Sequence, residues 1–155
     1  MAAQAEARAT AMWNDLQPSV FAVNRIRATF GALIAAQALH SIEEFHGRLY
    51  ETFAPARFMC GLVSRDLRIG FIIINVAFVV FGVWCHLWPL RRRWTFAPAL
   101  AWVWAAIEVI NGIGHPLWSL WQRAYQPGVA TAPLLLVLAL SLGYQLRLRP
   151  TGRPA

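Results

Sequence analysis

The chain has 155 residues, of which 58% are hydrophobic and only 14% are charged. About a quarter of the residues in a soluble domain are charged, so this composition argues against a soluble domain and favours a membrane protein. The formal net charge of +7 is the difference between 14 arginines and 7 acidic residues. These arginines flank apolar segments and accompany no nucleic-acid-binding motif, so we expect the lipid bilayer as a partner and no nucleic acid.

Four apolar segments are predicted to cross the membrane, because each approaches the roughly 20 residues that a bilayer requires. They cover residues 28–45, 69–88, 96–121 and 130–146. The second is the clearest, and it ends at Pro89 and three consecutive arginines. The predicted fold class is therefore all-α: a polytopic membrane protein built as a four-transmembrane-helix bundle.

The connections between these segments are predicted from composition. Residues 25–148 form the membrane domain, and residues 1–24 form a tail or an interfacial helix anchored by Trp13. Residues 47–68 are expected to be a loop, and residues 149–155 a C-terminal tail. Pro116 is expected to kink or end the third span.

Arginine distribution predicts the orientation. If both termini lie on one side, that side collects nine arginines against five on the other. Positive residues favour the cytoplasmic face. We therefore expect an integral protein of the bacterial inner membrane with both termini in the cytoplasm.

The first span ends in a cluster of polar residues that is expensive to place in a membrane and is usually kept for a function. Its motif is His40-x-x-Glu43-Glu44, preceded by Gln37. His40 and Glu44 are four residues apart, so they share one face of a helix with Gln37.

The third span carries a second polar set at a matching depth. Glu108 and His115 are seven residues apart and therefore point within about 20° of each other, with Asn111 beside them. At about 1.5 Å per residue, this set lies roughly 18–28 Å from the inner end, and His40 and Glu44 lie roughly 20–25 Å from it. Asn75 in the second span reaches about 20 Å. The side chains of the first and third spans are therefore predicted to face each other inside the bundle.

A divalent metal centre is the leading interpretation of this cluster, because mixtures of His and Glu suit zinc, iron or manganese. The predicted metal ligands are His40, Glu44, Glu108 and His115. Glu43 is predicted to be the catalytic base toward a bound water, or a residue that supports the ligands. Substrate-binding or supporting roles are assigned to Asn75, Asn111, Gln37 and Tyr125. The predicted function is a metal-dependent membrane enzyme, a hydrolase or an oxidoreductase, acting on a small or lipid-like substrate.

Two other interpretations of the cluster remain open: a metal-free acid/base or proton-relay site, and a structural network that holds the helices in register. The corresponding functions are a non-catalytic ligand-binding or transport protein, or an accessory membrane subunit. The sequence does not determine the oligomeric state.

Three motifs in order resemble the HXXEE-domain family of small multi-spanning membrane proteins. They are His40-x-x-Glu43-Glu44, then Asn111-x-x-x-His115, then Tyr125-x-Pro127-Gly128. The resemblance covers roughly residues 30–140. It implies the fold and indicates which residues matter, but it implies neither an activity nor a particular metal.

Overall fold

The computed structural model describes residues 2–148, with side chains described at residues 4 and 6 and from residue 22 onward. All regular secondary structure in this part of the chain is helical, without a strand. The elements are α1 (Ala2–His46), α2 (Leu49–Thr52), α3 (Ala54–Val63), α4 (Leu67–Cys85), the π-helical turn η1 (His86–Leu90), α5 (Ala97–Gln122) and α6 (Ala132–Arg147).

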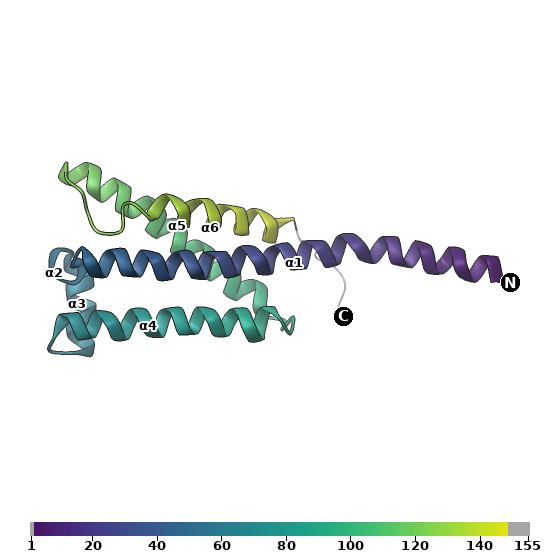
Figure 1. The fold of residues 1–155 in the computed structure, drawn as a ribbon, viewed down its shortest axis with the longest axis horizontal. Coiled ribbons are helices and arrows are strands. Elements are labelled where there is room, and N and C mark those ends of the chain that lie inside the picture. The colour runs from purple at the N-terminus through teal and green to yellow at the C-terminus, as the bar shows by residue number, and fades with distance from the viewer. Residues whose placement is uncertain (1, 149–155) are drawn as a thin grey trace.

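Helix α1 is the axis of the molecule. It runs between α4 and α6, and its N-terminal part projects beyond the other helices, while α5 crosses behind it (Figure 1). Helices α5 and α6 pack closely because Gly112 has no side chain: a Cβ there would lie 2.6 Å from the Cβ of Leu136. Helices α2 and α3 close the end of the bundle that holds the C-terminus of α1 (Figure 1).

The core lies among α1, α5 and α6 and is filled by fully buried Phe30, Leu33, Leu135 and Leu142. Trp104 of α5 joins α4 to this core, because its ring stacks on Phe78 with centroids 4.3 Å apart. Aromatic packing of this kind contributes beyond the burial of apolar area. The core therefore fixes how α1, α4 and α5 are positioned relative to one another along the bundle.

Two helical segments are long and apolar enough to cross a membrane, Leu67–Leu90 and Ala97–Gln122. Only 17% and 33% of their most apolar stretches are buried within the protein, so neither helix is enclosed by the rest of the chain. Side chains such as Ile72, Val76 and Ile110 face outward. A membrane crossing by the other two predicted spans remains a prediction.

Several local predictions differ from the structure. Residues 47–68, expected to be a loop, contain α2 and α3, and Pro55 lies in the first turn of α3, where proline is tolerated. Helix α5 continues through Pro116 to Gln122. The predicted N-terminal tail or interfacial helix is continuous with the first span in α1. The side chain of Trp13 and the predicted tail at 149–155 lie outside the described residues.

Candidate functional site: two histidines converging on Glu44

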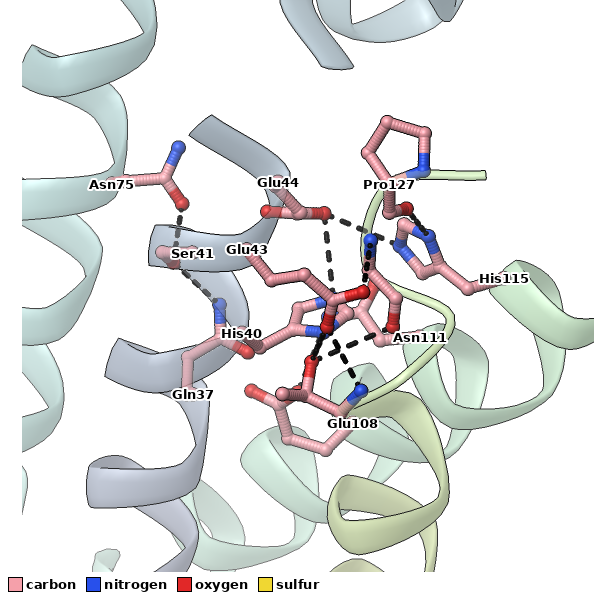
Figure 2. A network of polar contacts seen from close by, with 12 residues as sticks. Gln37, His40, Ser41, Glu43, Glu44, Asn75, Glu108, Asn111, His115 and Pro127 are labelled. Carbon is pink, nitrogen blue, oxygen red and sulfur yellow. Dashed lines mark hydrogen bonds and ion pairs between the residues drawn. The ribbon is translucent and has the colours of Figure 1, made fainter. Parts of the chain in front are cut away.

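Three side chains meet where α1 passes α5. His40 and Glu44 extend from consecutive turns of α1, and His115 reaches them from α5 (Figure 2). The Nε2 atoms of His40 and His115 lie 3.4 and 3.2 Å from the same oxygen, Oε1 of Glu44. His40 is fully buried, and the side chains of Glu44 and His115 are only 10% and 11% exposed. We call these three residues the His–Glu–His cluster.

The other ring nitrogen of each histidine is held by an acceptor. His115 Nδ1 lies 2.6 Å from the carbonyl oxygen of Pro127, which can only accept, so Nδ1 carries the proton. His40 Nδ1 lies 2.7 Å from Oγ1 of Thr131. That hydroxyl already donates to Oε2 of Glu43 at 2.6 Å, so it accepts from His40. With Nδ1 protonated in this way, a neutral imidazole at either position presents an unprotonated Nε2 toward Glu44, whereas an imidazolium would donate to it.

Glu43 binds the segment between α5 and α6. Its Oε1 accepts from the Tyr125 hydroxyl and from the backbone N–H groups of Gly128 (3.1 Å) and Ala130 (3.0 Å). Its Oε2 accepts from the N–H and hydroxyl of Thr131. The hydrogen bond to Glu43 raises the pKa of Tyr125 to about 12, because ionising the phenol would lose that bond and place two negative charges together. Glu43 thus holds residues 125–131 over the cluster.

Gly128 explains how closely this segment approaches the histidines. Its φ of 91° lies in the left-handed region that favours glycine. A Cβ at this position would lie 2.6 Å from His115 Nδ1 and 2.8 Å from His40 Cε1. Any larger residue would therefore force the segment or the rings to shift.

A second polar layer lies one turn nearer the middle of the bundle. Glu108 is fully buried, and the amide of Asn111 donates to its Oε2 at 3.2 Å. The amide of Gln37 is best oriented with its nitrogen toward Glu108, 2.9 and 3.2 Å from the two oxygens, because the reverse orientation would place three acceptor oxygens together. Ser41 extends the layer to α4 by donating to Oδ1 of Asn75 at 2.7 Å.

The His–Glu–His cluster fits a divalent metal. In a tetrahedral site with bonds of about 2.1 Å, two ligand atoms are about 3.4 Å apart, and the two histidine–glutamate separations are 3.4 and 3.2 Å. The three ligand atoms lie within 4.8 Å of one another. His40 Nε2 is buried and makes no hydrogen bond of normal geometry beyond its 3.4 Å approach to Glu44 Oε1, so it is available as a metal ligand. Hydrogen bonding of Nδ1 to a backbone or side-chain acceptor is the usual arrangement for ligating histidines.

The structure separates the predicted site residues into three groups. Three of the four predicted ligands, His40, Glu44 and His115, come together, whereas Glu108 lies outside their group. Glu43, predicted to be the base, has both oxygens occupied by the segment 125–131, and Tyr125 binds it there. Gln37, Asn75 and Asn111 belong to the layer around Glu108.

Thr131 is the functional residue that sequence reasoning missed. It occupies the N-cap position of α6 but makes no side-chain capping bond, because its hydroxyl joins Glu43 to His40. A Thr after a Pro-Gly turn predicts a helix start. No local pattern in the sequence reveals that the hydroxyl is used elsewhere.

These observations define a helical protein with two apolar helices of membrane-spanning length and a buried cluster of two histidines and a glutamate. The chain belongs to the family described as "Protein of unknown function with HXXEE motif", whose model matches residues 32–142. The three residue letters of that motif correspond here to His40, Glu43 and Glu44. No curated protein and no solved structure matches the chain.

Proposed function

We propose that this chain is an integral membrane protein whose His–Glu–His cluster binds one divalent metal ion and acts on a small or lipid-like substrate. The observation that supports this most strongly is the convergence of two Nε2 atoms on one carboxylate oxygen while both Nδ1 atoms are held by acceptors. Two imidazoles and a carboxylate leave coordination positions open, as catalytic zinc sites and the iron sites of many oxygenases do. A hydrolase and an oxidoreductase are therefore the two reaction classes for this donor set.

Membrane insertion is supported by the outer surface of the bundle. The exposed faces of α4 and α5 carry large aliphatic side chains over lengths that fit the hydrocarbon core. The proposal includes α1 and α6 as the remaining two spans, because α1 packs along α4 and α6 packs along α5 (Figure 1). In this arrangement the cluster lies in the outer half of the bundle.

The buried polar residues have three proposed roles: metal ligands, positioning residues and a proton acceptor. His40, Glu44 and His115 hold the ion, which when bound polarises a substrate oxygen or lowers the pKa of a water. Glu43 and Thr131 are positioning residues that fix the ring of His40 and the overlying segment. Glu108 is the buried carboxylate next to the cluster, held by Gln37 and Asn111, and is assigned to accept and return a proton.

A lipid-like substrate would approach beside the segment 125–131. An open groove runs there along the end of α5, lined by apolar Pro116, Leu120 and Val129 together with Arg123 and Tyr125. Pro116 follows the ligand His115, and Val129 follows Gly128, which covers both rings. An apolar wall with one cation suits a substrate that has an aliphatic chain and an anionic group.

A metal-free proton relay is the second candidate, and one observation favours it. Polar side chains from three helices lie close together: Ser41 donates to Asn75, while Gln37 and Asn111 donate to Glu108. Such groups within a membrane bundle are typical of proton pathways. In this function the cluster would hold protons on its two histidines in place of a metal.

Metal analysis separates the two functions. The protein is purified in detergent without chelators, and the metal content per chain is measured by mass spectrometry for the wild type and for His40→Ala, His115→Ala and Glu44→Gln. We expect about one ion per chain in the wild type and loss of the ion in each variant, because three-ligand sites rarely survive the loss of one ligand. The control is His46→Ala, which removes an exposed histidine from the end of the same helix. A wild type without metal, even after incubation with zinc, iron or manganese, would exclude the metal-dependent function and leave the relay.

A further inference from the structure

A second site lies at the opposite end of the bundle from the His–Glu–His cluster. Here α1, η1, α5 and α6 surround a cavity of about 30 Å³ whose lining includes Ile26, Arg27, Leu90, Arg93 and Trp94. Arg27 is 13 residues before His40 on α1, which places the two sites about 20 Å apart. The proposed metal centre and this cavity therefore share no residues.

Two cations line the cavity, the half-buried Arg27 and the exposed Arg93. Arg27 and Arg93 both line it, and neither forms a salt bridge with a carboxylate among the described side chains. Nε of Arg27 is buried and makes no hydrogen bond, and the same holds for Nδ1 of the nearby His86. Buried polar nitrogens without a partner are costly, so each needs an explanation, of which a bound water or ion is one.

The chemistry of the missing partner follows from the size and the lining of the cavity. A volume of 30 Å³ holds about two water-sized groups, which matches two oxygens of a phosphate better than a bulky molecule. Guanidinium groups pair with phosphate oxygens through parallel hydrogen bonds. The other lining residues, such as Leu90, Trp94 and Leu146, are apolar, so the remainder of the ligand should be apolar as well.

We propose that this cavity binds the phosphodiester group of an anionic phospholipid, with two phosphate oxygens between Arg27 and Arg93 and the acyl chains outside against the bundle. Basic pockets between helices on the cytoplasmic side of a membrane suit such headgroups, and the indole of Trp94 suits the interface. The inference rests on membrane insertion as part of the proposed function, but not on the metal centre.

The test compares two double variants with the same loss of charge. Arg27→Gln/Arg93→Gln removes the cations of the cavity, whereas Arg25→Gln/Arg92→Gln removes exposed arginines that do not line it. Native mass spectrometry in detergent then measures the binding of phosphatidylglycerol and of phosphatidylcholine with identical acyl chains. We expect the wild type and the Arg25/Arg92 variant to retain one phosphatidylglycerol per chain in preference to phosphatidylcholine. The Arg27/Arg93 variant should bind phosphatidylglycerol at least about tenfold more weakly, because it loses two charge-assisted contacts.

Three outcomes would overturn the inference. The first is a wild type that does not prefer phosphatidylglycerol, which is decisive even if a variant fails to fold. The second is an equal loss of binding in both double variants, which would indicate diffuse attraction in place of a site. The third is displacement of the lipid by inorganic phosphate at comparable concentration, which would make the ligand a free phosphate. Metal content is measured in parallel and should be unchanged in both double variants, so failure here is distinguishable from failure of the proposed metal centre.

Discussion

Replacing Gly128 by alanine tests whether the segment 125–131 sets the positions of the two histidines. The added Cβ would lie 2.6 Å from His115 Nδ1, whereas an ordinary contact begins at 3.4 Å, so the ring or the segment must move by about 3.4 − 2.6 = 0.8 Å. A left-handed backbone costs alanine about 1–2 kcal/mol, and overpacking costs about 1–3 kcal/mol. We therefore expect about 2–5 kcal/mol of lost stability.

Metal binding should weaken as well in Gly128→Ala, by about 10–100-fold, because displacing a residue that orients a ligand has effects of this size. The affinity is measured by competition with a chromophoric chelator in detergent, and the stability by thermal unfolding of the same samples. Gly114→Ala is the matched control: it lies next to His115, its Cβ would meet nothing within 4 Å, and its helical position tolerates alanine. If Gly128→Ala binds metal as tightly as the wild type, the histidines are not held by this segment.

Three further predictions concern the carboxylates and the phenol. Glu43→Gln should speed hydrogen exchange of the backbone amides at 128–131 by about tenfold or more, since a hydrogen bond to a charged acceptor contributes about 1.5–3 kcal/mol; unchanged exchange would mean that Glu43 does not hold the segment. Spectrophotometric titration should show Tyr125 ionising near pH 12 and shifting toward its ordinary value in Glu43→Gln. Because its folded pKa is raised, its contribution to stability should be complete below about pH 10 and lost as the pH rises through about 12. Glu108→Gln should keep its metal while Glu44→Gln loses it, and equal loss would make Glu108 a ligand.

The convergence of His40, Glu44 and His115 could be predicted from the periodicity of the helix. The four-residue spacing of His40 and Glu44, and the matching depth of His115, follow from 3.6 residues per turn and 1.5 Å per residue. These rules also explain why Glu108 separates from the cluster. Seven residues keep Glu108 and His115 on one face but place them about 10 Å apart along α5, so Glu108 meets the layer of Gln37.

The parts that escaped prediction depend on contacts between distant residues. Helices α2 and α3 are short, and the buried side chains of Leu49, Tyr50 and Cys60 pack with Phe71 of α4, which no local pattern reveals. The role of Glu43 likewise depends on the path of residues 125–131, which curl back so that their N–H groups point at its carboxylate. Loop conformation of this kind is set by tertiary contacts and not by local spacing.

The proposed metal centre is tested most directly by X-ray absorption at the edge of the metal found in the purified wild-type protein. The account predicts a first shell of nitrogen and oxygen atoms at about 2.0–2.2 Å, with the multiple scattering of two imidazoles. His115→Ala should lose the signal of one imidazole or the metal itself. A shell of sulfur atoms near 2.3 Å, from the free thiols of Cys60 and Cys85, would contradict the account, as would a shell without imidazole.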